Sequence, residues 1–136
     1  MNRFFFLLIL LGKLTNGYSQ NYWQQEAHYK MNIDFNVEKH QFDGEQILTY
    51  INHSPDTLKQ VFYHLYFNAF RPGSMMDIRS RTILDPDKRV GNRISKLTND
   101  EMGIQRILSL KQNEQEIDFE INETILEVNL KNHIFP

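Results

Sequence analysis

The sequence predicts an all-β fold, built as an antiparallel sheet or sandwich. Three observations predict it: several segments alternate apolar and polar residues, clusters of turn-forming residues separate them, and the expected strands follow one another as hairpins. A parallel α/β fold is disfavoured because it would need crossover connections between its strands. With 136 residues, the chain suffices for one domain and is too short for a multidomain hydrolase.

The first predicted hairpin covers residues 28–52. Apolar and polar side chains alternate over residues 28–37, which indicates a strand with one face in a core and the other in water. Residues 38–41 form the expected turn, and residues 42–52 the second strand. Gly44 within that strand indicates a bulge or a close approach of another backbone.

A third strand is predicted to run through residues 58–70. Residues 52–56 read Asn-His-Ser-Pro-Asp, and this density of turn formers ends the strand before them. From Val61 onwards the odd positions are apolar or aromatic, and the even positions carry aromatic rings beside polar groups. One face should enter a core and the other should be partly covered, by a surface that could lie outside this chain.

An irregular basic loop is expected at about residues 71–98. Prolines and glycines interrupt this stretch, and its periodicity is lost. Met75 and Met76 indicate a short helical turn, and residues 85–87 a turn. A loop of this length is uncommon in a compact domain, so it should be functional or pack on a neighbour.

The remainder of the chain predicts three further strands. The first covers residues 104–110 and is followed by a polar turn at 111–115. Residues 117–121 alternate as the next strand, and Asn122 and Glu123 form a tight connection to a last strand at 125–130.

Composition excludes several functions. A formal net charge of −2 gives no field that would mark a nucleic-acid or acidic-membrane partner. The absence of cysteine rules out disulfides, thiolate zinc sites and a cysteine nucleophile. Stability must therefore come from packing alone.

The amino-terminal residues 1–19 have the layout of a signal peptide. Arg3 supplies a positive charge, residues 4–11 are an unbroken apolar run, and small residues at Gly17 and Ser19 suit cleavage after Ser19. Eight apolar residues span only about 12 Å as a helix, against a bilayer core of about 30 Å, which disfavours a membrane anchor. We therefore expect an exported protein, periplasmic or extracellular. The alternative is a buried amino-terminal strand or helix.

No catalytic, cofactor-binding or metal-binding residue is assigned. The five histidines contain no pair at positions i and i+4, and none is followed by glutamate, so the zinc-binding His-Glu-x-x-His helix is absent. His64 needs a hydrogen-bond partner if it is buried. No Gly-x-Ser-x-Gly elbow and no Gly-x-Gly loop occurs, which disfavours a serine hydrolase and a nucleotide site. The histidines are His28, His40, His53, His64 and His133.

The arginines between Arg71 and Arg93 allow two interpretations. They could clamp a carboxylate or a phosphate of a ligand. Such a run is more often a solvated surface, or it pairs with acidic residues of an adjoining domain. The set comprises Arg71, Arg79, Arg81, Arg89 and Arg93.

Several segments together resemble a known family. Residues 29–35 (Tyr-Lys-Met-Asn-Ile-Asp-Phe), 42–44 (Phe-Asp-Gly), 50–54 (Tyr-Ile-Asn-His-Ser) and 58–70 look like successive strands of the amino-terminal β-domain of zinc metallo-aminopeptidases of the membrane alanyl aminopeptidase family, exported bacterial type. The resemblance implies a saddle-shaped β-domain, present in part over residues 20–136 and incomplete at its carboxyl end. It also implies truncation before the catalytic domain.

The resemblance implies a non-catalytic role. In the full-length parent, zinc and a glutamate base hydrolyse peptides from the amino terminus. This chain carries neither the zinc helix nor the family's Gly-x-Met-Glu-Asn strand, so it is expected to be inactive alone, to bind no cofactor, and to pack against the parent's catalytic domain. The competing hypothesis is a free-standing exported β-sandwich module that binds a glycan or a protein.

Overall fold

The computed structural model describes residues 22–136 and confirms the all-β class. Strands make up 41% of the structure, all pairings are antiparallel, and the described residues contain one α-helix. The chain divides into two compact units, with the boundary between Ser54 and Pro55. The predicted signal peptide, residues 1–19, lies outside the described residues.

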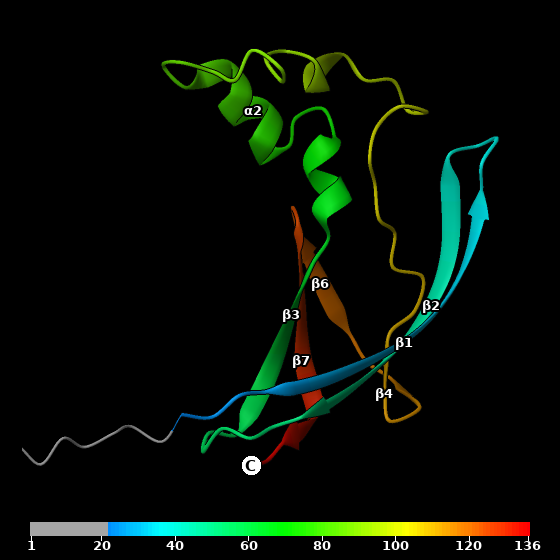
Figure 1. Cartoon of the computed structure of the whole chain (residues 1–136), viewed down its shortest axis with the longest axis vertical. Helices are drawn as coiled ribbons and strands as arrows, with labels where there is room; N and C mark the ends of the chain where they lie inside the picture. Colours follow the sequence, from blue (N-terminus) through cyan, green and yellow to red (C-terminus); the bar gives the residue numbers. More distant parts are fainter. Residues whose placement is uncertain (1–21) are drawn as a thin grey trace, which may run out of the picture. The chain divides into compact units, whose positions relative to one another are not determined.

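The first unit contains the predicted hairpin. Strands β1 (Glu26–Asn36) and β2 (Gln41–Ile51) pair along their full length without a register shift (Figure 1). The turn is closed by the side chain of Asn36, whose Oδ1 accepts the N–H of Lys39 at 2.9 Å. Alternation in the sequence thus produced the expected pair of strands.

The bulge predicted at Gly44 is absent. Gly44 lies directly opposite Ile33 within the unbroken register. A Cβ built at Gly44 would meet its nearest atom, the carbonyl oxygen of Asn32, at 3.6 Å, which is an ordinary contact. Neither a bulge nor a close backbone approach therefore explains this glycine.

A cluster of hydrogen bonds around Asn52 holds the end of the hairpin. The buried Asn52 accepts three hydrogen bonds at Oδ1: from Gln25 Nε2 at 2.8 Å, from the backbone N–H of Ser54 at 3.0 Å and from Ser54 Oγ at 2.7 Å. The predicted turn at residues 52–56 is thus the point where β2 ends, and side-chain hydrogen bonds replace the strand ladder there.

The second unit is built on a three-stranded sheet. Its strands are β3 (Leu58–His64), β7 (Ile125–Ile134) and β6 (Phe119–Asn122), in the order β3-β7-β6. A separate small hairpin pairs β4 (Lys111–Gln112) with β5 (Gln115–Glu116) through a turn in which Asn113 and Glu114 have positive φ. The core of the unit is small, and its buried members are Leu65, Ile117, Leu126 and Val128.

The third strand is shorter than predicted. It ends at His64, and residues Tyr66–Phe70 form a 3₁₀ helix, η1, instead of continuing the strand. The partner strand β7 begins at Ile125, opposite His64, so β3 has no strand residue left to pair with beyond this point. The N–H of Leu65 donates to the carbonyl oxygen of Thr124 at 2.7 Å, and the buried Asn68 donates from Nδ2 to the carbonyl oxygen of Glu123 at 3.2 Å.

The predicted irregular loop at residues 71–98 contains helices. Helix α2 covers Met75–Thr82, and a second 3₁₀ helix, η2, covers Ile94–Lys96; both lie beyond one end of the β3-β7-β6 sheet (Figure 1). Ser74 caps α2, because its Oγ accepts the N–H of Asp77 at 3.2 Å. An acidic residue in the first turn and arginines in the last suit the helix dipole. The expected short helical turn is therefore a capped helix of eight residues.

The strand predicted at residues 104–110 does not form. This segment is extended, but its backbone bonds to other groups rather than to a neighbouring strand. The N–H of Gln105 donates to Oδ1 of Asn68 at 2.7 Å, and the carbonyl oxygen of Leu110 accepts the N–H of Ile117 at 3.0 Å. Asn68 thus joins η1, the β6–β7 turn and this extended segment.

We expect Gly103→Ala to lower the free energy of unfolding by about 1–3 kcal/mol, the usual cost of overpacking. A Cβ at Gly103 would lie 2.8 Å from the carbonyl oxygen of Phe67, which is too close for any real side chain. The glycine N–H also donates to the carbonyl oxygen of Phe70 at 3.2 Å, so the backbone has little freedom to withdraw. Urea unfolding followed by circular dichroism measures the loss. Gly44→Ala, where the added Cβ makes only ordinary contacts, is the control, and an equal loss in both variants would disprove the steric argument.

Candidate functional site

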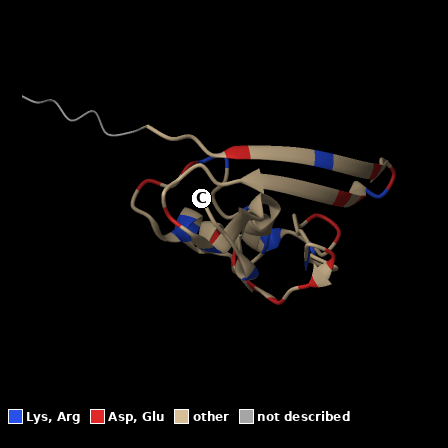
Figure 2. Ribbon diagram, turned by 90° about the horizontal axis from the view of Figure 1, so that it is seen from below, with Lys and Arg blue, Asp and Glu red and all other residues tan. Residues whose placement is uncertain are grey.

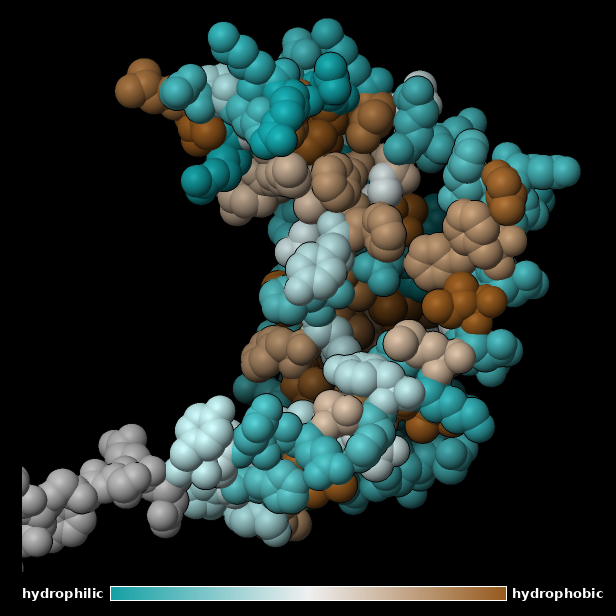
Figure 3. All heavy atoms as spheres, viewed as in Figure 1, coloured by the Kyte–Doolittle hydropathy of each residue, from teal (hydrophilic) through white to brown (hydrophobic). Residues whose placement is uncertain are grey.

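One face of the β1–β2 hairpin is apolar and exposed. Residues directly opposite each other in an antiparallel pair share a face, so the register assigns every side chain to one side. We call this surface the apolar hairpin face. Its four large apolar residues on β1 are each 57–59% exposed, and Figure 3 shows hydrophobic side chains along the hairpin. The face consists of Ala27, Tyr29, Met31, Ile33 and Phe35 on β1, and Phe42, Gly44, Gln46, Leu48 and Tyr50 on β2.

The opposite face of the hairpin is mostly polar. His28, Lys30 and Asn32 lie there, opposite Thr49, Ile47 and Glu45. Two large apolar residues also lie on this face: Ile47, which is 63% exposed, and Ile51, which is 41% exposed and pairs with Glu26. The charged residues of the hairpin gather mainly near its turn and leave most of both strands uncharged (Figure 2). An isolated two-stranded hairpin is marginally stable in water, so this one is suited to being covered on its apolar side.

Two histidines contact one glutamate at the start of β1. Glu26 Oε1 lies 2.6 Å from His28 Nε2, and Glu26 Oε2 lies 3.3 Å from His53 Nε2. These hydrogen bonds lower the pKa of Glu26. The described residues include no group of three or more His, Cys, Asp or Glu arranged to hold a metal ion.

The remaining three histidines lie in different elements. His64 is exposed and stacks on Tyr66, with ring centroids 5.1 Å apart, so it does not need the buried partner that the sequence suggested. His40 takes a positive φ in the hairpin turn, and His133 is exposed on β7.

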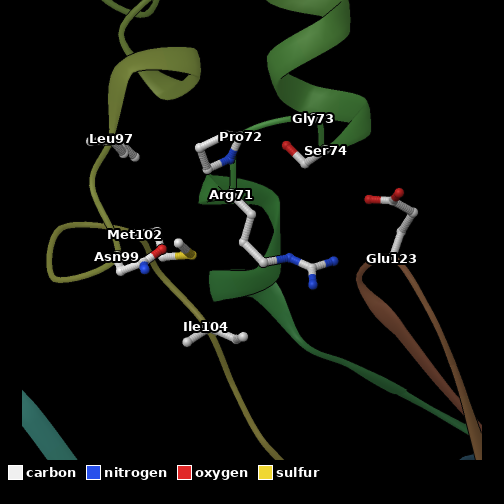
Figure 4. A pocket seen from close by; sticks show the side chains of 9 residues that line it. All are labelled: Arg71, Pro72, Gly73, Ser74, Leu97, Asn99, Met102, Ile104 and Glu123. Carbon is white, nitrogen blue, oxygen red and sulfur yellow. The ribbon is translucent and has the colours of Figure 1, made fainter.

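The second unit contains a pocket of about 460 Å³ at the start of α2. Segments distant in the sequence line it: the residues before α2, the segment around Met102, and the β6–β7 turn (Figure 4). One wall of the pocket is apolar, and the guanidinium of Arg71 and the carboxylate of Glu123 border the rest. The lining residues are Arg71, Pro72, Gly73, Ser74, Leu97, Asn99, Met102, Ile104 and Glu123.

The two charged groups of the pocket are held by local backbone geometry. Arg71 Nε donates to the carbonyl oxygen of Asn68 at 3.2 Å, which ties the guanidinium to η1. Glu123 has a φ of 57° in the tight β6–β7 turn, and its Oε2 accepts the N–H of Met75 at 3.4 Å. The predicted turn at Asn122 and Glu123 is confirmed, but nothing in the sequence indicated that its glutamate would meet α2.

Asp77 anchors the entry to α2. Its side chain is 1% exposed and makes a two-point ion pair with Arg81, at 2.9 and 3.0 Å, while Oδ2 also accepts the N–H of Gly73 at 2.9 Å. The hydrogen bonds from Arg81 and then from Gly73 lower the pKa of this carboxyl. The wall of the pocket at Gly73 and Ser74 is thereby fixed.

Asp77 should make stability depend on acid pH. Its carboxyl has a lower pKa in the folded than in the unfolded chain, so its contribution is complete above the ordinary value of 3.8 and is lost as the pH falls through the folded pKa. Asp77→Asn should lower the melting temperature by several degrees at pH 7 and flatten its decline below pH 4, as measured by thermal unfolding across pH. Asp85→Asn on the same segment is the control. Parallel pH profiles for wild type and Asp77→Asn would contradict this role.

The arginines do not gather into a single clamp. Arg71 lines the pocket, Arg81 pairs with the buried Asp77, and Arg89 pairs with Asp87 at 2.7 Å. Arg79 lies exposed on α2, and Arg93 is exposed just before η2. The ligand-clamp interpretation therefore applies to Arg71 alone.

Comparisons with protein-family models, curated proteins and solved structures found no match to this chain. Within residues 22–136, no helix has the length and apolar character needed to cross a membrane.

Proposed function

We propose that this chain is the non-catalytic amino-terminal β-domain of an exported zinc aminopeptidase, and that its apolar hairpin face packs against the catalytic domain. The proposal rests on the family resemblance of residues 22–136 and on one structural observation. Four large side chains on the same side of β1 are more than half exposed, on a strand pair with no register fault.

Burial explains why this face should be covered. Each large apolar side chain transferred from water into an interface contributes about 1.5–3 kcal/mol. A contiguous row of such residues on one face, with polar residues on the other, is the pattern of a sheet that packs on one side. The polar side, with Lys30 and Glu45, would stay in water.

Binding to a catalytic domain tests the proposal. The chain is mixed with the thermolysin-like catalytic domain of an exported bacterial zinc aminopeptidase, produced without its own amino-terminal domain, and sedimentation velocity follows the mixture. We expect a one-to-one complex. Two separate species, or self-association of the chain that the catalytic domain does not displace, would overturn the proposal.

The purified chain should neither retain stoichiometric zinc nor hydrolyse aminoacyl reporter substrates. The zinc-binding His-Glu-x-x-His sequence does not occur in its 136 residues. Metal analysis after dialysis and a fluorogenic aminopeptidase assay measure both properties, with a complete zinc aminopeptidase as the positive control. Zinc-dependent turnover by the chain alone would contradict a non-catalytic role.

A further inference from the structure

We propose that the pocket at the start of α2 binds a small zwitterion, an α-amino acid with an apolar side chain. Arg71 would bind the carboxylate, Glu123 the ammonium group, and the apolar wall the side chain. The pocket lies entirely within the second unit, so this proposal stands independently of the apolar hairpin face of the first unit.

Arg71 offers the donors that a carboxylate needs. Only its Nε donates a hydrogen bond within residues 22–136, to the carbonyl oxygen of Asn68. The two terminal amino groups of the guanidinium face the pocket space without a protein acceptor among those residues. A planar guanidinium binds a carboxylate through two parallel hydrogen bonds, which a lysine cannot reproduce.

Glu123 supplies the complementary charge. Its Oε2 accepts one long hydrogen bond, 3.4 Å from the N–H of Met75, and Oε1 has no hydrogen-bond partner in the part of the chain that is described. The side chains of Arg71 and Glu123 extend toward each other from opposite sides without forming an ion pair within 4 Å (Figure 4). A ligand that carries both charges could bridge them, whereas a simple anion or cation would leave one group unpaired.

The rest of the pocket suits a short apolar side chain. Pro72, Leu97, Met102 and Ile104 supply carbon atoms on the side away from Glu123. A volume of about 460 Å³ is in the range of small-molecule sites and exceeds the size of one amino acid. Asn99, also in the lining, can hydrogen-bond to either charged group of the ligand.

Titration with L-leucine, followed by NMR of the intact chain, tests the proposal. We expect saturable shifts in the millimolar range at residues that line the pocket. Leucinamide, which lacks the carboxylate, and 4-methylpentanoate, which lacks the ammonium group, should each bind about tenfold more weakly or worse, because each loses a charge-assisted hydrogen bond. Equal binding of leucine and either analogue, or no shifts at tens of millimolar leucine, would overturn the assignment.

Two variants assign the roles of the charged residues. Arg71→Gln and Glu123→Gln should each weaken leucine binding by about tenfold or more, and Arg71→Gln should also abolish the preference for leucine over leucinamide. Glutamine at 123 still accepts the Met75 N–H, so α2 should remain in place. Arg79→Gln and Glu120→Gln, which lie outside the pocket, are the matched controls. Unchanged leucine affinity in both pocket variants, with melting temperatures equal to wild type, would refute the proposed contacts.

Discussion

Leu126→Ala is expected to lower the free energy of unfolding of the second unit by about 2–5 kcal/mol, the range for deleting a buried leucine side chain. Leu126 is 3% exposed on the central strand β7 and lies between Tyr63 of β3 and Ile121 of β6. The core around it contains three other buried apolar residues, Leu65, Ile117 and Val128, and partly buried side chains pack against them, so deleting most of the leucine side chain leaves a cavity among packed neighbours. Because natural domains are stabilised by only about 5–15 kcal/mol, a loss near the upper end would unfold much of the unit.

Chemical unfolding by urea, followed by far-ultraviolet circular dichroism, measures this loss. Leu108→Ala is the matched control, because it makes the same chemical change at a position that is 89% exposed. That control should change the free energy of unfolding by less than about 0.5 kcal/mol. If both substitutions cost the same, Leu126 would not belong to a packed core.

Ile33→Lys is expected to weaken the complex with the catalytic domain by more than tenfold, the least cost of placing an unpaired ammonium group in an apolar contact. Ile33 lies at the middle of the apolar hairpin face and is 59% exposed. In the free chain the lysine stays in water, so the hairpin itself should tolerate the change. Isothermal titration of the chain with the catalytic domain gives the dissociation constants.

Ile47→Lys tests whether the loss of binding depends on which face of the hairpin carries the lysine. Ile47 has nearly the same exposure as Ile33 but lies on the polar face of the same hairpin. Its variant should bind the catalytic domain with unchanged affinity within experimental error. Equal weakening by the two lysines would mean that the hairpin does not dock through its apolar face.

The hairpin of the first unit could be predicted because its cause is local. Apolar and polar side chains alternate through residues 28–37, and the turn predicted at residues 38–41 lies within one residue of the observed connection at 37–40, which joins two strands of equal length. The exposure of the apolar hairpin face could not be predicted from the sequence in the same way. Alternation shows that a strand has an apolar face, but it does not show how exposed that face is, and here Tyr29 and Phe35 are each 58% exposed.

The second unit departs from the sequence prediction where distant contacts override local pattern. Residues 65–70 continue the apolar alternation of β3, yet the partner strand β7 begins opposite His64, and the hydrogen bonds of Asn68 with Glu123 and Gln105 hold η1 beyond the end of the strand. Partners more than 35 positions away leave no signal in a local window. The contact of Asn68 with Gln105 also holds the segment at 104–110, which was predicted as a strand and does not form one.

The sequence around α2 contains a helix-start pattern, but the pattern is too short to predict a helix. Ser74 followed three residues later by Asp77 is a helix-start pattern, but Pro72 and Gly73 just before it favour a loop. The pocket could not be foreseen, because Arg71 and Glu123 are brought together only when the β6–β7 turn meets the start of α2.

Oxidative footprinting of methionines, with and without the catalytic domain, tests the docking claim most directly. Met31 lies on the apolar hairpin face and is 57% exposed, while Met75 on α2 is 67% exposed and serves as an internal reference. Both should oxidise readily in the free chain, and in the complex Met31 alone should be protected, as mass spectrometry would show. Oxidation of Met31 at an unchanged rate within a verified complex would contradict packing through this face.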